Sequence, residues 1–402
     1  MIRLFLLFFY QCSLFASFSG QIIDANTSKP IPFAFISDGE KTIQADKNGS
    51  FIFQSNAKKY FIKAYGYKPY HTEQNTTKIK LTPIHIKALY LNFWNASNHS
   101  KKLKNILNII DKTQINAIVV DIKNSYGSTS FLTSFQQAND YGAYKKRTNR
   151  NIQKFIQLMK QKNIYTIARI ITFKDELQAI HNPNYAIKNP NGTLWRSADN
   201  KAWVDPFDTR SHKYTIAIAK EAAKVGFDEI NFDYLRFPAK KELQYSQENN
   251  ASNRIKAITH FLQLAKQELQ KYGVFISVDI YGNICWVKND GNIGQTITSL
   301  AKYADYISPM LYPSSFSSGS FHSKYPASKP YEVVYKSLKN IKNKINSKRI
   351  RPWLQHFRDY NTKRIKYTKT QIQQQIKATQ DAHTSGWMLW SPSSRYHKDY
   401  YN

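Results

Sequence analysis

Cysteine is nearly absent from this sequence of 402 residues, in which only Cys12 and Cys285 occur. Cys12 lies in an N-terminal segment that we expect to be removed, for the reasons given below. Cys285 would then be the single cysteine of the mature chain. One cysteine excludes an intramolecular disulfide and a cysteine-based metal site.

Several short catalytic motifs are missing as well. The sequence has no GxxxxGK phosphate loop, no GxGxxG dinucleotide motif, no HExxH zinc motif and no GxSxG nucleophile turn. Nucleotide hydrolysis, hydride transfer and zinc proteolysis therefore lack support. We expect no metal ion and no cofactor.

Acidic side chains are scarce compared with basic ones. Fifty-eight Lys and Arg residues against 27 Asp and Glu give a formal net charge of +31, which favours attraction to polyanions. The lysines are scattered, however, as in the helical segment that contains Lys101, Lys102 and Lys104, and a solvated basic surface explains them more simply. We expect no nucleic-acid partner, and the sequence does not predict an oligomeric state.

Long apolar runs are absent after the first twenty residues, "MIRLFLLFFYQCSLFASFSG". Arg3, an apolar stretch and then small residues are typical of a secretory signal, here residues 1–19 with cleavage near Ser19. The prediction is an exported protein, periplasmic or extracellular, that could associate with the envelope. A retained membrane anchor is the alternative, since the apolar run is almost long enough to span a bilayer. Gln11 and the early position of Cys12 argue against lipidation.

Residues 20–84 consist of short β-rich runs separated by Asp, Asn, Gly and Pro, which predicts a small all-β sandwich. The segment Pro30-Ile31-Pro32, the turn and strand "ADKNGSFIF" and the later "AYGYKP" resemble the carboxypeptidase-regulatory-like domain, a transthyretin-type module. That resemblance implies a spacer or docking domain without catalysis.

From residue 85 to residue 402, eight apolar runs alternate with amphipathic segments whose apolar residues recur at three- and four-residue spacing. The runs are 87–94, 116–123, 164–173, 229–235, 275–282, 305–313, 350–357 and 386–392. Eight strands alternating with helices over this length predict an α/β fold, a (β/α)₈ TIM barrel. A doubly wound sheet is the alternative.

Active sites of TIM barrels lie at the carboxyl ends of the strands, and polar residues collect at those positions in this sequence. They are Asn95, Asp121, Lys123, Lys174, Asp175, Asp233, Arg236, Asp279, Tyr312, Gln355 and His356. In "DEINFDYLRFP", strand alternation places Asn231 and Asp233 on one face, opposite Ile230 and Phe232. A carboxylate placed there must be paired, hydrogen-bonded or functional.

Asp233 and Asp279 follow neighbouring strands and are our candidate catalytic residues. Two carboxyl groups on either side of a glycosidic bond are the minimal machinery of glycoside hydrolysis, one as acid and the other as nucleophile or base. Arg236 would keep the Asp233 carboxylate ionised. The alternative is a structural pair in which Asp233 binds Arg236 only to brace the loop.

Aromatic residues make up 14% of the chain, and all seven tryptophans lie in the barrel segment. Aromatic faces suit the apolar faces of sugar rings, although core packing explains about half of these tryptophans. We predict a polysaccharide or oligosaccharide partner. The predicted substrate-binding residues are Asp121, Lys123, Arg169, Asn231, Arg236, Tyr312, Trp353, Gln355 and Trp390.

The segments "TIARIITFKD", "GTLWRSADNKAWVDPFD", "GFDEINFDYLRFP", "ISPMLYPSSF", "RPWLQHF" and "GWMLWSP" resemble the DUF4015 family of bacterial glycoside hydrolase barrels, from about residue 86 to the end. The resemblance implies a glycan-cleaving TIM barrel related to α-amylase-type enzymes.

By similarity to the amylase layout, Asp233 would be the nucleophile and Asp279 the general acid/base. Amylase-type barrels usually carry Glu at the second position, so the shorter Asp279 leaves retention or inversion open. His356 replaces an expected acidic residue, where it would tune local charge. A non-catalytic glycan-binding or envelope-scaffold protein is the alternative function.

Overall fold

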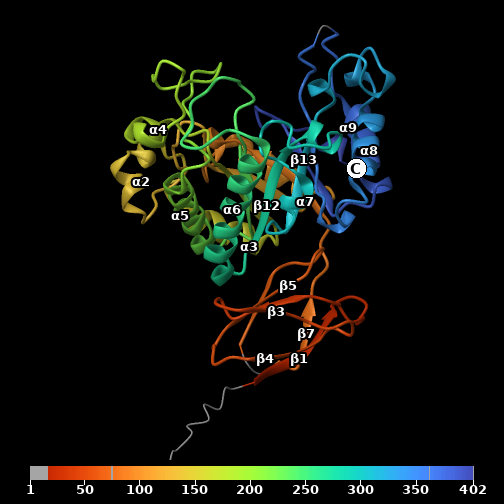
Figure 1. Ribbon diagram of the computed structural model, residues 1–402. Helices are drawn as coiled ribbons and strands as arrows, with labels where there is room; N and C mark the ends of the chain where they lie inside the picture. The colour runs from red at the N-terminus through yellow and green to blue at the C-terminus, as the bar shows by residue number, and fades with distance from the viewer. Residues whose placement is uncertain (1–16, 74–75, 362, 402) are drawn as a thin grey trace, which may run out of the picture.

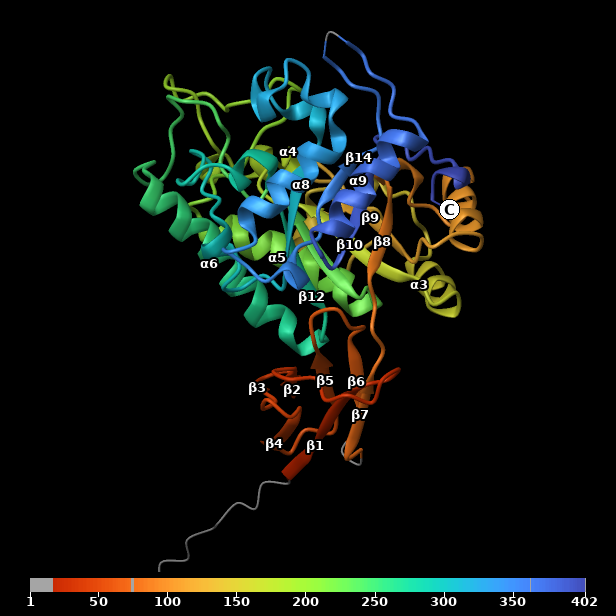
Figure 2. The same cartoon turned by 90° about the vertical axis from the view of Figure 1, so that its right-hand side faces the viewer.

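The computed structural model describes residues 17–73, 76–361 and 363–401. Residues 1–16 of the predicted signal lie outside the described residues. The described chain forms a small β-sandwich, Ser17–Leu81, followed by a large barrel that begins at Ile86. In Figures 1 and 2, the sandwich lies below one end of the barrel.

The sandwich consists of two sheets with the strand orders β4-β1-β7 and β3-β2-β5-β6. Its strands are β1 Ser17–Asp24, β2 Phe35–Ser37, β3 Thr42–Gln44, β4 Ser50–Gln54, β5 Tyr60–Lys63, β6 Tyr70–Thr72 and β7 Lys78–Leu81. Buried and exposed residues alternate along β4 and β7, as expected for sheets with one face in the core. The predicted all-β N-terminal part is confirmed.

The sandwich begins at Ser17, inside the segment predicted to be removed. Phe18 is buried in the sandwich core and stacks on Tyr60, with ring centroids 4.2 Å apart. It also pairs with Phe53 in the register of β1 and β4. Cleavage near Ser19 would therefore remove a core aromatic residue and shorten β1.

The eight predicted barrel strands are all present and close into one parallel barrel, in the order β10-β11-β12-β13-β14-β15-β8-β9. They are β8 Ile86–Leu91, β9 Ala117–Lys123, β10 Tyr165–Ile171, β11 Glu229–Asp233, β12 Phe275–Tyr281, β13 Tyr306–Leu311, β14 Trp353–Gln355 and β15 Gly386–Trp390. The TIM-barrel prediction is confirmed, and the doubly wound alternative is wrong because β15 pairs with β8 to close the sheet.

Helices pack around the outside of the barrel (Figure 1). The α-helices are α1 Lys101–Ile110, α2 Gln136–Asp140, α3 Ile152–Gln161, α4 Glu176–His181, α5 Thr209–Val225, α6 Ala251–Leu269, α7 Ile297–Leu300, α8 Pro330–Ile341 and α9 Lys369–Asp381. Short 3₁₀ helices are η1 Phe93–Asn95, η2 Ala143–Lys146, η3 Pro183–Tyr185, η4 Gln270–Tyr272, η5 Gly282–Cys285, η6 Pro313–Ser315, η7 Ser320–His322, η8 Pro326–Ser328, η9 Ser347–Arg349 and η10 Lys398–Tyr400. None of the helices in the described ranges is long and apolar enough to cross a membrane.

Local sequence sets the ends of the long helices. The side chains of Ser100, Asn151, Asp208 and Asn250 accept hydrogen bonds from the first turns of α1, α3, α5 and α6. Such caps satisfy amide groups that have no partner inside the helix. Gly226 ends α5 with a left-handed φ of 103°, a conformation that glycine adopts without steric cost. The capping side chains therefore fix where these helices begin, and Gly226 fixes where α5 ends.

The barrel interior near the sandwich contains a buried ion pair. Arg351 donates to both carboxylate oxygens of Glu229, at 2.9 and 2.8 Å, and the Tyr165 hydroxyl donates to the same carboxylate at 3.0 Å. The Arg351 guanidinium also lies 4.1 Å from the ring centroid of Tyr306. This cluster occupies the end of the barrel that faces the sandwich.

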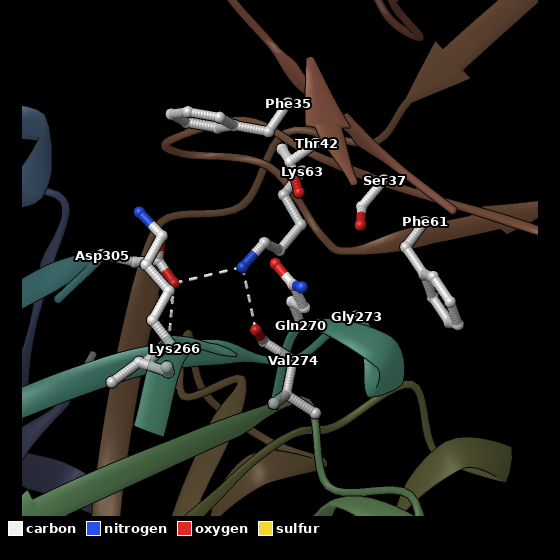
Figure 3. A pocket seen from close by; sticks show the side chains of 11 residues that line it. Phe35, Ser37, Thr42, Phe61, Lys63, Lys266, Gln270, Gly273, Val274 and Asp305 are labelled. Atoms are coloured by element: carbon white, nitrogen blue, oxygen red, sulfur yellow. Dashed lines mark hydrogen bonds and ion pairs between the residues drawn. The ribbon is translucent and has the colours of Figure 1, made fainter. Parts of the chain in front are cut away.

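The sandwich contacts the amino ends of the barrel strands. Lys63 donates hydrogen bonds to the Val274 carbonyl oxygen at 2.9 Å and to Asp305 Oδ2 at 3.2 Å (Figure 3). The Gly66 amide donates to the Tyr306 hydroxyl at 3.2 Å. A cavity of about 40 Å³ between the two parts lies beside the Lys63 contacts. Since the sandwich covers the amino ends, the carboxyl ends of the strands are at the opposite end of the barrel.

Candidate active site

Neighbouring strands bring charged side chains together at the carboxyl end of the barrel. Asn231 of β11 is in register with both Arg169 of β10 and Ser277 of β12. Strand alternation then directs Asp233, two residues after Asn231, and Asp279, two residues after Ser277, toward the same interior. Arg169, Asp233 and Asp279 line one cavity of about 190 Å³.

Most of the remaining cavity wall is aromatic. The other lining residues are Tyr234, Arg236, Tyr281, Met310, Tyr312, Trp353 and Trp390. Trp390 stacks on Tyr90 with ring centroids 4.0 Å apart and lies 4.8 Å from the Arg169 guanidinium. A cavity with aromatic walls and a few charged groups suits a sugar, whose ring has apolar C–H faces and polar hydroxyls.

Arg169 holds the carboxylates in place. Its Nη1 donates to Asp121 Oδ1 at 2.6 Å, while Nε donates to Asp233 Oδ2 at 3.1 Å and Nη2 donates to that same oxygen. The distance from Nε to Asp279 Oδ2 is 3.9 Å. Because Asp233 Oδ2 and Asp279 Oδ2 lie 3.1 and 3.9 Å from one nitrogen, the two oxygens are at most 7.0 Å apart.

Asp279 is the deeper of the two carboxyl groups, with 1% of its surface exposed. Its Oδ1 accepts hydrogen bonds from Asn231 Nδ2 and Trp353 Nε1, both at 2.8 Å. Its Oδ2 has no hydrogen-bond partner among the described residues. Burial raises the pKa of Asp279 well above its usual value, and the charge of Asp233 raises it further. The group is therefore suited to carry a proton that Oδ2 can donate.

Asp233 has different surroundings. Its Oδ2 receives two hydrogen bonds from Arg169, and its Oδ1 accepts a hydrogen bond of 2.6 Å from the Tyr234 amide. Hydrogen bonds from a guanidinium and an amide hold both oxygens of this carboxyl group in fixed positions. Tyr234 has a φ of 52°, a left-handed conformation that is costly for a tyrosine. This turn ends β11 at Asp233 and places Tyr234 in the cavity wall.

The structure brings most of the predicted site residues to this cavity. Two of them, Asp121 and Asn231, lie beneath it and contact its charged residues without lining it. Asp121 accepts hydrogen bonds from Arg169 and from the Tyr90 hydroxyl, and Asn231 donates to Asp279. Neither Asp121 nor Asn231 lies in the cavity wall, so their predicted contact with substrate stays a prediction.

Lys123 and Gln355, two further predicted substrate-binding residues, do not line this cavity. Lys123 is fully buried and lies 2.8 Å from Asp175, which is also fully buried. Gln355 Nε2 donates to Ser314 Oγ at 2.7 Å, and its Oε1 accepts from the Ser314 amide at 3.0 Å. Both side chains are at strand ends, but their hydrogen bonds hold neighbouring loops instead of facing the cavity.

The predicted contact between Asp233 and Arg236 is also wrong. Asp233 is bound by Arg169, while the Arg236 guanidinium donates to the Phe237 carbonyl oxygen and the Tyr281 hydroxyl, both at 2.9 Å. Proximity in sequence suggested the wrong arginine. The guanidinium that binds Asp233 comes from β10, the strand beside β11.

His356 does not tune the charge of the site. Its ring lies beside Tyr396 and Tyr401, and Nε2 is 3.1 Å from the Tyr401 hydroxyl. Burial lowers the pKa of His356 to about 4. The ring is therefore neutral at physiological pH and belongs to the packing of the C-terminal segment.

Some cavity residues were missed by the sequence analysis, namely Tyr234, Tyr281 and Met310. Tyr281 follows Asp279 by two residues on β12, so the alternation that identified Asp279 could have identified it. Tyr234 reaches the cavity only through its left-handed turn, for which the sequence gives no signal. In the part of the chain that the structure describes, no group of three or more His, Cys, Asp or Glu residues is placed to hold a metal ion.

Comparison with protein families identifies this barrel. Residues 88–396 match the DUF4015 family, described as "Putative glycosyl hydrolase domain". The chain belongs to the DUF4015 family. The match covers every barrel strand except the first two residues of β8 and includes both aspartates of the cavity. A comparison with curated proteins found no match.

Two of the solved structures similar to this DUF4015 domain agree with its barrel fold. The glycoside hydrolase domain of PgaB (BpsB) from Bordetella bronchiseptica is 11% identical with a TM-score of 0.54, and covers 78% of this chain and 95% of its own. Alpha-L-fucosidase isoenzyme 2 from Paenibacillus thiaminolyticus is 11% identical with a TM-score of 0.53, and covers 79% and 48%. A hypothetical protein from Ruminiclostridium thermocellum is 34% identical with a TM-score of 0.43, and covers 48% and 96%.

Proposed function

We propose that this protein cleaves glycosidic bonds of a polysaccharide, with Asp233 and Asp279 as the catalytic pair. One observation carries the proposal: two carboxyl groups of one cavity, at most 7.0 Å apart, have opposite surroundings. A buried carboxyl group with a raised pKa beside a second carboxyl group that is bound by a guanidinium is typical of acid and nucleophile assignments in enzymes. Membership in a glycosyl hydrolase family supports the same chemistry.

The roles follow from the surroundings. Asp279, whose pKa is raised by burial, would protonate the glycosidic oxygen from Oδ2 as the bond breaks. Asp233, which receives the hydrogen bonds of Arg169, would attack the anomeric carbon as the ionised carboxylate. In the second step, Asp279 would accept a proton from the water that releases the sugar. Trp353 and Asn231 would hold Asp279 in position through its other oxygen.

We further propose that the protein is exported, on the basis of its N-terminal residues, and that the leader is cleaved before Ser17. Cleavage at that point keeps Phe18 in the sandwich core and β1 at its full length. The mass of the mature N-terminal peptide tests this proposal. A mature chain that begins after Ser19 would contradict it. The resemblance of the sandwich to the carboxypeptidase-regulatory-like domain stays a prediction.

The experiment for the proposed function is a screen for new reducing ends released from a panel of neutral and acidic polysaccharides of bacterial envelopes. The unmodified protein is compared with the double variant Asp233→Asn/Asp279→Asn, and with Asp199→Asn as a control. Asp199 is paired with Lys174 at 2.7 Å outside the cavity. We expect release by the unmodified protein and by the control alone. Polysaccharide binding without release by any of the three proteins would instead identify a glycan-binding barrel.

A further inference from the structure

Arg236 differs from the other arginine of the cavity in having no acidic partner. Arg169 contacts Asp121 and Asp233 and lies 3.9 Å from Asp279. Arg236 also lines the cavity, and only 8% of its surface is exposed. Within the described ranges, no carboxylate lies within ion-pair distance of Arg236, and both of its hydrogen bonds go to neutral oxygens.

Aromatic rings surround this guanidinium. Its central carbon lies 4.5 Å from the ring centroid of Tyr281, 5.0 Å from that of Trp203 and 5.1 Å from that of Tyr234. Aromatic faces attract a cation but do not neutralise its charge. They also keep water away from the guanidinium. Its attraction to any anion that reaches it is therefore stronger than it would be in water. The two hydrogen bonds to Phe237 and Tyr281 use two of its five N–H donors.

Buried charges in proteins are usually paired, because an unpaired charge loses its hydration without compensation. The cavity that Arg236 lines has a volume of about 190 Å³, and a guanidinium fork matches a planar carboxylate or a sulfate group. We propose that the sugar bound in the cavity carries an anionic group, a carboxylate or a sulfate, that pairs with Arg236. This inference rests on the proposed function only in taking the ligand to be a glycan.

The position of Arg236 also solves an electrostatic problem for such a substrate. An anionic sugar in the same cavity as the ionised Asp233 is repelled by that carboxylate. Arg169 is shared between Asp121 and Asp233 and offsets only part of their charge, whereas Arg236 would be available to offset the charge of the sugar. The formal net charge of +31 would in addition attract an acidic polymer to the protein.

The test measures binding, so that it does not depend on catalysis. The full chain carrying Asp279→Asn slows turnover strongly while conserving the shape of that side chain. Its ligands are uronic acid oligosaccharides, the same oligosaccharides with their carboxyl groups reduced to alcohols, and sulfated oligosaccharides with their desulfated forms. Calorimetry at constant physiological ionic strength gives each affinity. The two pairs of ligands distinguish a carboxylate from a sulfate.

We expect at least one acidic oligosaccharide to bind about tenfold more tightly than its neutral counterpart, as a charge-assisted pair predicts. Adding Arg236→Gln should reduce that preference to less than about threefold, and Arg236→Lys should keep part of it. The control is Lys174→Gln, which removes a cation 5.0 Å from the same Tyr234 ring, but one that is already paired with Asp199. This control should keep the preference.

Equal binding of acidic and neutral forms, no binding of any acidic form, or a preference that survives Arg236→Gln would overturn the inference. Arg236 would then only brace the Phe237 and Tyr281 segments. Release of reducing ends from neutral polymers together with equal binding would leave the proposed function standing without the inference. An Arg236-dependent preference without any hydrolysis would support the inference and contradict the proposed function.

Discussion

Asp233 and Asp279 are the same residue type at the ends of neighbouring strands, yet their surroundings differ. Arg169 and a main-chain amide bind Asp233, whereas Asp279 is buried and its Oδ2 has no hydrogen-bond partner among the described residues. Burial and the adjacent carboxylate favour the protonated form of Asp279. The division of labour in the proposed mechanism follows from this contrast.

The raised pKa of Asp279 predicts a pH dependence of the reaction. The acid must carry its proton in the first step, so kcat/KM should be constant while Asp279 is protonated and fall as the pH rises through its pKa. That pKa lies well above the usual 3.8 because of burial and Asp233. A pH–rate profile of reducing-end release measures this limb. The residual activity of Asp279→Asn should lack the limb, and an identical limb in that variant would exclude Asp279 as the acid.

The short separation of the two carboxyl groups predicts the stereochemistry. Retaining enzymes have catalytic carboxyl groups about 5 to 5.5 Å apart, and inverting enzymes about 6.5 to 9.5 Å apart. The upper limit of 7.0 Å between the Oδ2 atoms includes the first range and only the lower edge of the second. We therefore expect retention of the anomeric configuration. Proton NMR of the first product anomer measures it, and an inverted first product would contradict the nucleophile role of Asp233.

The strands were predictable from sequence because barrel strands are buried on both faces and appear as continuous apolar runs. All eight runs correspond to β8 through β15. The fate of single polar residues at strand ends was less predictable. Lys123 forms an ion pair with Asp175, and Gln355 donates a hydrogen bond to Ser314. Neither partner could be predicted from local sequence, because Asp175 and Ser314 each follow another strand.

The same limit explains why Arg236 was predicted as the partner of Asp233, whereas the structure shows Arg169 in that position. Strand adjacency in the closed barrel brings Arg169 beside Asp233, although the two are 64 positions apart in sequence. Periodicity shows which face of a strand a residue occupies. It does not show which of several inward side chains will meet across neighbouring strands, because that depends on register and side-chain length.

At the scale of elements, the ion pair between Glu229 of β11 and Arg351, just before β14, spans the barrel interior. Arg351→Met should destabilise the fold by about 3 to 5 kcal/mol, because it leaves a buried carboxylate without its partner. The double variant Glu229→Gln/Arg351→Met removes both charges and should recover most of that loss. Urea unfolding measures both free energies. Equal losses in the single and the double variant would contradict this account.

At the scale of the whole molecule, the sandwich and the cavity lie at opposite ends of the barrel. The sandwich lies at one end of the barrel, beside the amino ends of its strands (Figures 1 and 2). The cavity is lined by residues from the carboxyl ends of the strands. The sandwich therefore leaves the cavity free and can influence it only through the barrel. Changes at the contact between the two parts should affect stability without affecting catalysis.

Lys63 tests this separation. Lys63→Met removes the hydrogen bonds to Asp305 and to the Val274 carbonyl oxygen. Because the side chains of Lys63 and Asp305 are largely buried, this change should lower the free energy of unfolding by about 1 to 3 kcal/mol. The initial rate of polysaccharide hydrolysis per folded molecule should not change. Lys58→Met, at an exposed position of the same sandwich, is the control and should alter neither quantity. A large loss of rate in folded Lys63→Met protein would show that the two ends are coupled.

The most direct test of the account is the initial rate of hydrolysis by Asp233→Asn and by Asp279→Asn, each measured separately on a polysaccharide that the unmodified protein cleaves. Both variants should keep the thermal stability of the unmodified protein to within a few degrees, and each should lose a factor of about 10² to 10⁴ in rate, the contribution typical of a positioned acid, base or nucleophile. A folded variant that keeps more than about one tenth of the rate would contradict the catalytic role of that aspartate.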